Sequence, residues 1–452
     1  MTNVCTAKPS VRWAAPPLRS ARRNIVPSIV MLISIVMGPA MIIQVGGRTP
    51  VVLWADLMVV AMAAYAALRF APRLMNEVRR LPWIFWMYFA YLVVATVYLA
   101  LSRDWLIGLA TWKLRVMPPL ALFIAYTSVR DAESARRIGW AFGLTGGVTA
   151  VLTIANFVTI SRGGAGAFNN AVVTSKDMAQ TSFGTSNYLA SILIFCLPWC
   201  IVTWSRSRLW ASVLSISSAG IILWALLLTQ SRGALISVVA GVLLFLMELV
   251  LAHKIRLRTV LSVLGVIAFT IVTAYWIWSM APYSVASELA KRTDLLISDF
   301  SAHNWANNRT EVWMPAVDYI AAHPVIGLGL GNQALAGDLL GRVDTAHNVL
   351  LEAWLELGAL GFLLLFGFLY RGWKTWHSVA FGQRRWGIGL GLAGVLSFEV
   401  SILHCMVEPS FWGVQFAYLF WMALGVGLAL LRLQNEAART LVIRVPSTWT
   451  SR

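Results

Sequence analysis

The chain has 452 residues, of which 59% are hydrophobic and only 12% are charged, which excludes the composition of an ordinary soluble enzyme. The net charge of +17 would suit a nucleic-acid-binding protein, but most cations cluster at every second boundary between apolar runs. The charge pattern therefore reports membrane topology, and we expect no nucleic-acid partner.

Apolar runs of about 20 residues recur along the chain, and a helix of that length crosses roughly 30 Å of hydrocarbon. They predict an all-α integral membrane protein with about 12 transmembrane helices and cytoplasmic N and C termini. We place residues 1–279 in the first nine transmembrane helices, 280–347 in one long external loop with short helices, 348–432 in the last three helices and 433–452 in a cytoplasmic tail. The expected spans, in chain order, are 25–46, 49–69, 82–101, 107–128, 138–160, 184–204, 210–229, 233–252, 259–279, 348–370, 387–406 and 412–431.

Cations on the external side need a specific reason, because the positive-inside rule disfavours them there. Lys113 and Arg115 lie inside the fourth apolar run, just before two consecutive prolines, and this is typical of backbone that lines a cavity. Snorkelling of both side chains to the external interface explains them equally well. Arg162 lies in an external segment, 161–183, that is rich in Gly, Asn, Ser and Thr, and a surface loop is the default interpretation there.

Arg232 is the most informative external cation. It occupies a hairpin of two or three residues between the seventh and eighth apolar runs, within Thr229-Gln230-Ser231-Arg232-Gly233-Ala234. A cation at the bilayer centre costs about 2.5–3.5 kcal/mol on insertion scales, and less near the interface. An arginine that binds lipid headgroups is one interpretation, and recognition of an anionic substrate is the one we favour.

The long external loop contains a predicted amphipathic helix over residues 309–322, because apolar residues recur there at helical spacing. Asn308 resembles an N-cap and Pro324 ends the helix, while three glycines at alternate positions after it permit a tight return. Arg309 would then lie in the first helical turn, where free backbone N–H groups and the helix dipole already favour an anion.

His347 follows Asp344 and Thr345 at the expected start of the tenth span. The dipole at a helix N-terminus disfavours the protonated ring, so we expect a neutral imidazole that can accept a proton. A lone histidine at a membrane boundary is more often a capping or lipid-contact residue, but Arg232 and Arg309 lie on the same side of the membrane. We therefore take His347 as the candidate general base.

Glu352 and Glu356 lie four residues apart in the first turns of the same span. Intramembrane carboxylates require a cation partner, so we expect them to hold one of the external arginines. The helical angle of 100° per residue predicts that Glu352 faces away from His347. No His, Cys, Asp or Glu set in the sequence has clear metal-ligand spacing, so we expect no metal.

Four motifs in order resemble the O-antigen ligase and polymerase family of bacterial envelope enzymes, and they cover about residues 184–361. Each motif alone is loose, whereas their order, spacing and common side of the membrane make the set fairly specific. The twelve-helix layout extends the resemblance to the whole chain. The motifs are Gly184-Thr185-Ser186-Asn187-Tyr188-Leu189-Ala190; Thr229-Gln230-Ser231-Arg232-Gly233-Ala234; Arg309 through Trp313 with His323-Pro324-x-x-Gly327-x-Gly329; and Ala346-His347-Asn348 followed by Glu356-Leu357-Gly358-x-x-Gly361.

The resemblance implies a multi-pass, lipid-diphosphate-dependent glycosyltransferase of the bacterial inner (cytoplasmic) membrane, surrounded by membrane lipids and with its active site facing the periplasm. An O-antigen ligase transfers O-antigen polysaccharide from undecaprenyl diphosphate to a sugar hydroxyl of the lipid A–core oligosaccharide, with no metal and no other cofactor. By motif, the resemblance carries a catalytic role to His347 and diphosphate binding to Arg232 and Arg309. Weaker candidates for substrate binding are Lys113, Arg115, Arg162, Asn187 and Asn348.

The chemistry of a glycosyl diphosphate agrees with these roles, because arginine forks suit phosphate oxygens. His347 would deprotonate the acceptor hydroxyl for inverting attack, and a hydrogen bond from His347 to the diphosphate is its alternative role. An O-antigen polymerase or a protein O-oligosaccharyltransferase would use the same donor. A lipid-linked glycan transporter or flippase is the alternative of another class, although the sequence lacks the internal symmetry that many transporters show.

Overall fold

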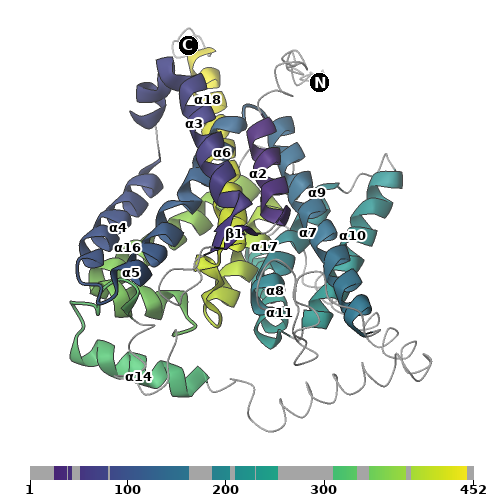
Figure 1. The fold of residues 1–452 in the computed structure, drawn as a ribbon. Coiled ribbons are helices and arrows are strands. Elements are labelled where there is room, and N and C mark those ends of the chain that lie inside the picture. The colour runs from purple at the N-terminus through teal and green to yellow at the C-terminus, as the bar shows by residue number, and fades with distance from the viewer. Residues whose placement is uncertain are drawn as a thin grey trace, which may run out of the picture.

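The computed structural model describes residues 25–37, 39–42, 51–79, 82–161, 186–203, 209–229, 231–252, 309–332, 346–382 and 388–444 (Figure 1). The expected ninth span, the proposed cap at Asn308 and the candidate Arg162 lie outside these residues. The described elements are α2 (Val26–Met37), β1 (Pro39–Ile42), β2 (Val51–Leu53), α3 (Trp54–Arg79), α4 (Trp83–Leu99), α5 (Trp105–Val116), α6 (Pro118–Ser128), α7 (Ala132–Ser161), α8 (Ser186–Cys196), η2 (Leu197–Trp199), α9 (Cys200–Thr203), α10 (Leu209–Thr229), α11 (Arg232–Leu251), α14 (Arg309–Ala322), α16 (Val349–Phe381), α17 (Ile388–Cys405), η5 (Pro409–Trp412) and α18 (Val414–Arg444).

The apolar helices form a bundle suited to a membrane. Within the described part of the chain, six helices are long and apolar enough to cross a bilayer, and five shorter apolar helices accompany them. Large apolar side chains on their outer surfaces are exposed, as Leu68 (78%) and Leu209 (81%) illustrate. Such exposure is unfavourable in water but suits contact with lipid tails. The chain is therefore a multi-pass membrane protein.

The expected first span is wrong in its second half. α2 ends at Met37, and residues 39–42 instead form β1, which pairs antiparallel with β2. Pro39 explains the helix end, because proline disfavours the helical conformation in the residue before it and lacks the N–H that a helix needs. The fold is thus helical apart from this short hairpin among the described residues.

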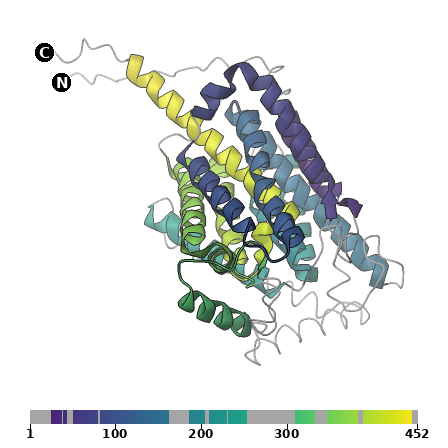
Figure 2. The same cartoon turned by 60° about the vertical axis from the view of Figure 1, so that its left-hand side comes forward.

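The centre of the bundle is aromatic. Trp421 on α18 packs against Tyr88 on α4 and Phe368 on α16, with ring centroids 4.3 and 4.8 Å away. α18 crosses the molecule through this core, as Figure 2 shows, and nearly all of its residues from 415 to 430 are buried. Burial of large rings on three helices fixes the spacing of the bundle and hence the positions of the helix ends.

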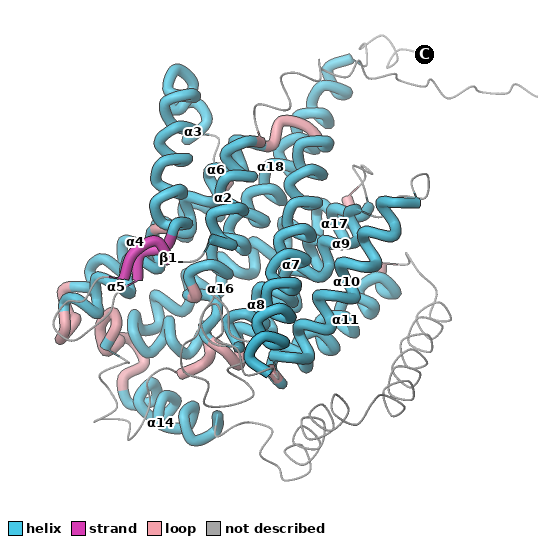
Figure 3. Tube along the Cα trace, turned by 45° about the vertical axis from the view of Figure 1, so that its right-hand side comes forward, coloured by secondary structure: helices cyan, strands magenta, loops and turns pink. Residues whose placement is uncertain are grey.

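The external helix predicted over residues 309–322 is α14, with the same bounds. It lies at the end of the bundle opposite the C-terminal end of α18 in Figures 1 and 2, and Figure 3 gives the same arrangement. The starts of α8, α11 and α16 all point toward the half of the molecule that contains α14. The candidate site is built there.

Candidate active site

Two tryptophan side chains form hydrogen bonds between the α14 segment and the start of α16. The indole N–H of Trp313 donates to the backbone carbonyl of Ala346 at 2.9 Å, and that of Trp354 donates to the carbonyl of Pro324 at 2.9 Å. Ala316 is fully buried in the small apolar cluster between the two helices. The backbone of Arg309 begins α14, one helical turn before Trp313.

His347 stands just outside α16 in an unusual backbone conformation. Its φ of 49° is the one positive value at a non-glycine residue in the described part of the chain. Left-handed backbone at such a residue persists where the surroundings impose it, and it recurs at functional sites. Asn348 is the helix N-cap: its side-chain oxygen accepts from the N–H groups of Leu350 and Leu351, which separates His347 from the helix proper.

This turn overrides the predicted orientation of Glu352. The predicted orientation assumes that His347 and Glu352 belong to one helix, but α16 begins only at Val349. The backbone N–H of His347 donates to the buried Glu352 carboxyl. The helical angle assumed for this pair does not apply, because His347 has a positive φ and lies outside α16. Glu352 thereby fixes the turn that presents the imidazole.

Glu408 joins the histidine to a second helix. Its Oε2 lies 3.8 Å from Nδ1 of His347 and accepts a hydrogen bond of 3.0 Å from Nδ2 of Asn187, in the first turn of α8. Glu408 is buried, and the His347 side chain is 29% exposed. The imidazole therefore has a carboxylate beside one nitrogen and remains accessible to a substrate.

Arg232 begins α11 directly after a short connection from α10, as the sequence predicts. The neighbouring Gly233 packs against the turn that precedes Glu408: a Cβ placed there would lie 2.9 Å from Val407 and 3.6 Å from the His404 ring. The first turn of α11 thus lies against the same turn, 406–413, that carries Glu408. The starts of α8, α11 and α16 meet around the turn 406–413. Because helix N-termini favour anions, this arrangement favours binding of an anionic group.

The glycines after α14 insert into a break in α16. Gly358 has a φ of 66°, which opens the helix and frees carbonyls that would otherwise be used within it. The N–H of Leu328 donates to the carbonyl of Leu355 and that of Gly329 donates to the carbonyl of Glu356, at 2.8 and 3.1 Å. The predicted tight return is confirmed, with positive φ at Gly329 and Gly331.

Arg115 forms a buried ion pair with Glu356, so one of the two carboxylates, Glu352 and Glu356, holds an arginine as expected. The guanidinium also donates to Tyr91 at 3.0 Å and lies 4.3 Å over the ring of Trp412. Glu356 in turn accepts from the N–H of Gly331 at 3.0 Å. Arg115 therefore joins α5, α16 and the glycine loop beneath the site.

Lys113 has a separate partner. Its ammonium group contacts Asp56 on α3, and Asp56 also accepts a hydrogen bond from the hydroxyl of Tyr418 on α18. The lysine is 27% exposed in its side chain, in contrast to Arg115 at 1%. Of the two cations in the fourth span, Arg115 is buried, whereas Lys113 is partly exposed and pairs with the buried carboxylate of Asp56.

Glu408 therefore lies between Asn187, which donates a hydrogen bond to it, and His347, at 3.8 Å, with the start of α11 packed against the same turn. Sequence reasoning missed Glu408. A usable signal existed, because this carboxylate stands between two apolar spans, where an acid requires a specific partner.

Comparison with known proteins agrees with the motif resemblance. Residues 217–366 match the O-antigen ligase family. No curated protein matches the chain at the significance required of a relative. The matched segment contains Arg232, Arg309, His347 and the Gly358 break, whereas Arg115, Asn187 and Glu408 lie outside it. Over this segment, about a third of its length, the chain is therefore similar to the O-antigen ligase family.

Proposed function

We propose that this protein is an O-antigen ligase that transfers O-antigen polysaccharide from undecaprenyl diphosphate to a sugar hydroxyl of the lipid A–core oligosaccharide. The reaction takes place at the periplasmic face of the bacterial inner membrane. Members of the matched family are enzymes that act on lipid-linked glycans. The observation that carries the proposal is the partly exposed imidazole of His347 beside Glu408, at the meeting point of three helix starts.

In the proposed step, the acceptor hydroxyl oxygen attacks the anomeric carbon that is bonded to the diphosphate. The carbon–oxygen bond to the diphosphate breaks, its electron pair leaves with undecaprenyl diphosphate, and the hydroxyl proton passes to Nε2 of His347. Attack opposite the leaving group inverts the anomeric carbon. A positioned base contributes about 10²–10⁴-fold to such a step.

Arg232 and Arg309 are the proposed diphosphate ligands. Each begins a helix, so the guanidinium and the free N–H groups of the first turn act on the same anion. Charge stabilisation of the leaving group in a partly dry site is usually the largest catalytic contribution. The chemistry requires neither a metal nor a nucleotide sugar, because the diphosphate is already a good leaving group.

The proposal is tested with purified protein in proteoliposomes, carrier-linked glycan as donor and lipid A–core as acceptor. We expect glycan to appear on lipid A–core with the wild type, and a loss of at least 100-fold with His347→Ala. Glycan that lengthens on the carrier without any lipid A–core would instead identify a polymerase. Carrier movement that is lost in His347→Ala while ligation persists would identify a transporter.

A further inference from the structure

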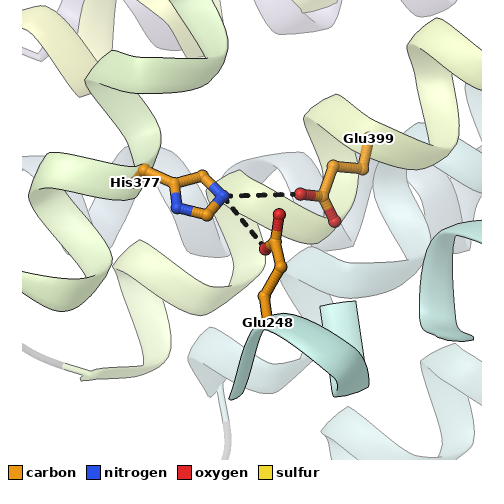
Figure 4. A group of neighbouring side chains, drawn as sticks. All are labelled: Glu248, His377 and Glu399. Carbon is orange, nitrogen blue, oxygen red and sulfur yellow. Dashed lines mark ion pairs between the residues drawn. The ribbon is translucent and has the colours of Figure 1, made fainter. Parts of the chain in front are cut away.

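A second polar cluster lies inside the bundle, away from the candidate active site. It consists of Glu248 on α11, His377 on α16 and Glu399 on α17, and Figure 4 shows the imidazole pointing between the two carboxylates. Nε2 of His377 lies 2.9 Å from Oε2 of Glu248 and 3.6 Å from Oε1 of Glu399. One ligand atom from each residue lies within 4.8 Å of the others.

The three groups converge on one point, with Nε2 of His377 within ion-pair distance of both carboxylates. Among the described residues, Nε2 of His377 and an Oε2 atom of each glutamate are buried without a hydrogen-bond partner. Glu399 is only 4% exposed. Two carboxylates held this close in a low-dielectric interior repel one another, and a cation between them removes that repulsion.

The histidine and one carboxylate are held in place by their neighbours. The indole N–H of Trp373 donates to Oε1 of Glu399 at 3.1 Å, and the His377 ring packs between Trp373 and Phe381, with centroids 4.1 and 5.1 Å away. A hydrogen bond to a ligating carboxylate and a fixed imidazole plane are the supporting features of metal sites in proteins. Side-chain exposures of 11% for Glu248 and 21% for His377 leave a path for an ion.

The cluster is far from His347. The stretch of α16 between Gly358 and His377 alone spans roughly 28 Å at about 1.5 Å per residue, and Arg232 and Glu248 are separated along α11 by roughly 24 Å. The same three helices nevertheless lead to the candidate active site: α11 begins at Arg232, α16 follows His347, and α17 leads into the turn with Glu408.

We propose that Glu248, His377 and Glu399 bind one divalent transition-metal ion, of the zinc type, that ties α11, α16 and α17 together. Imidazole nitrogen and carboxylate oxygen are zinc ligands at about 2.0–2.2 Å, which places the ligand atoms roughly 3.3–3.5 Å apart in a tetrahedral site. The two distances from His377 bracket that separation, and a water molecule would complete the four ligands of the ion. The ion is structural, and the proposal does not depend on the proposed transfer reaction.

The test is direct metal binding to the full-length chain, purified in detergent with an affinity tag that contains no histidine. Protein stripped with a chelator is titrated with Co²⁺ and Zn²⁺, and bound metal is counted by mass spectrometry after gel filtration. We expect one tightly bound equivalent, the visible absorption of tetrahedral Co²⁺, and a melting temperature that rises when Zn²⁺ is restored. His377→Gln and Glu399→Gln should each weaken binding at least tenfold, whereas His323→Gln, at an exposed histidine on the loop after α14, should bind as the wild type does.

Size-exclusion profiles and melting curves of the stripped variants show whether they are folded. If His377→Gln or Glu399→Gln is not folded, Glu248→Gln replaces it in the binding measurement. Stripped wild-type protein that binds neither ion would overturn the proposal and show that the three groups share protons instead. Equal binding by His377→Gln and the wild type would also overturn it. Neither result bears on transfer by the His347 site, which is measured separately.

Discussion

Nδ1 of His347 lies 3.8 Å from Oε2 of Glu408, a carboxylate that α8 holds through Asn187. Such a carboxylate orients the imidazole and stabilises the positive charge that forms when the ring takes a proton, as in other base–carboxylate pairs. We expect Glu408→Gln to lower kcat by roughly tenfold to 100-fold with little change in KM for the acceptor. Steady-state transfer assays measure both constants, with Glu133→Gln, an exposed glutamate on α7, as the control.

A variant that instead raised KM and left kcat intact would assign Glu408 to substrate binding. Loss of the folded protein would be seen as aggregation in size-exclusion chromatography, and in that case Asn187→Ala, which removes only the donor to Glu408, gives the second measurement.

Arg232 and Arg309 give the second prediction. If each neutralises the departing diphosphate, then Arg232→Ala and Arg309→Ala should each lower transfer by about 10²–10³-fold, the usual cost of removing one such stabilising group. Lysine at either position keeps the charge but loses the planar fork, so an intermediate rate is expected. Arg137→Ala, at a surface cation paired with Glu133, is the matched control.

Near-normal transfer by either alanine variant would remove that arginine from the site. Membrane yield and melting temperature are compared with the control, so that a loss of activity is separated from a loss of protein.

The buried pair of Arg115 and Glu356 gives the third prediction, which concerns stability. Glu356→Ala leaves the guanidinium inside the bundle without its carboxylate and removes the acceptor of the Gly331 N–H, so we expect a loss of about 3–5 kcal/mol. The double variant Arg115→Met/Glu356→Leu removes both charges and should recover much of that loss. Thermal and denaturant melting in detergent measure the difference, and a double variant no more stable than Glu356→Ala would contradict the pairing.

Gly358 gives the fourth prediction. A Cβ at this position would lie 2.1 Å from the carbonyl oxygen of Val325, and the φ of 66° is itself unfavourable for alanine. Gly358→Ala should therefore destabilise the docking of the glycine loop, at a cost of more than about 1 kcal/mol. Gly220→Ala on α10 is the control, because a Cβ there meets nothing within 4 Å. Equal melting temperatures for the two variants would show that the break in α16 is not required.

Hydropathy alone located the six described helices that are long and apolar enough to cross a bilayer, because a spanning helix needs a long apolar run. The bounds of α14 were also predictable, since an amphipathic repeat between Arg309 and a proline leaves little freedom. The β1–β2 hairpin was missed because its residues are as apolar as those of a span, and only Pro39 marks the change.

The site was predictable only in part, for a reason of geometry. Sequence motifs contain only residues that are near one another in the chain. They therefore grouped His347 with Asn348, and Glu356 with Gly358 and Gly361. The contacts of His347 with Glu408 and of Arg115 with Glu356 join helices far apart in the chain. The Glu248, His377 and Glu399 cluster was missed for the same reason, since each residue comes from a different helix.

The two tryptophan hydrogen bonds between α14 and the beginning of α16 have a mechanical consequence. Trp313 holds Ala346 at one end of α14, and Trp354 holds Pro324 at the other. α14 therefore cannot swing outward as a hinged flap unless both bonds break. If the chain acts on lipid-linked reactants as proposed, they would reach His347 past a fixed α14, and movement of α14 would not set the rate of turnover.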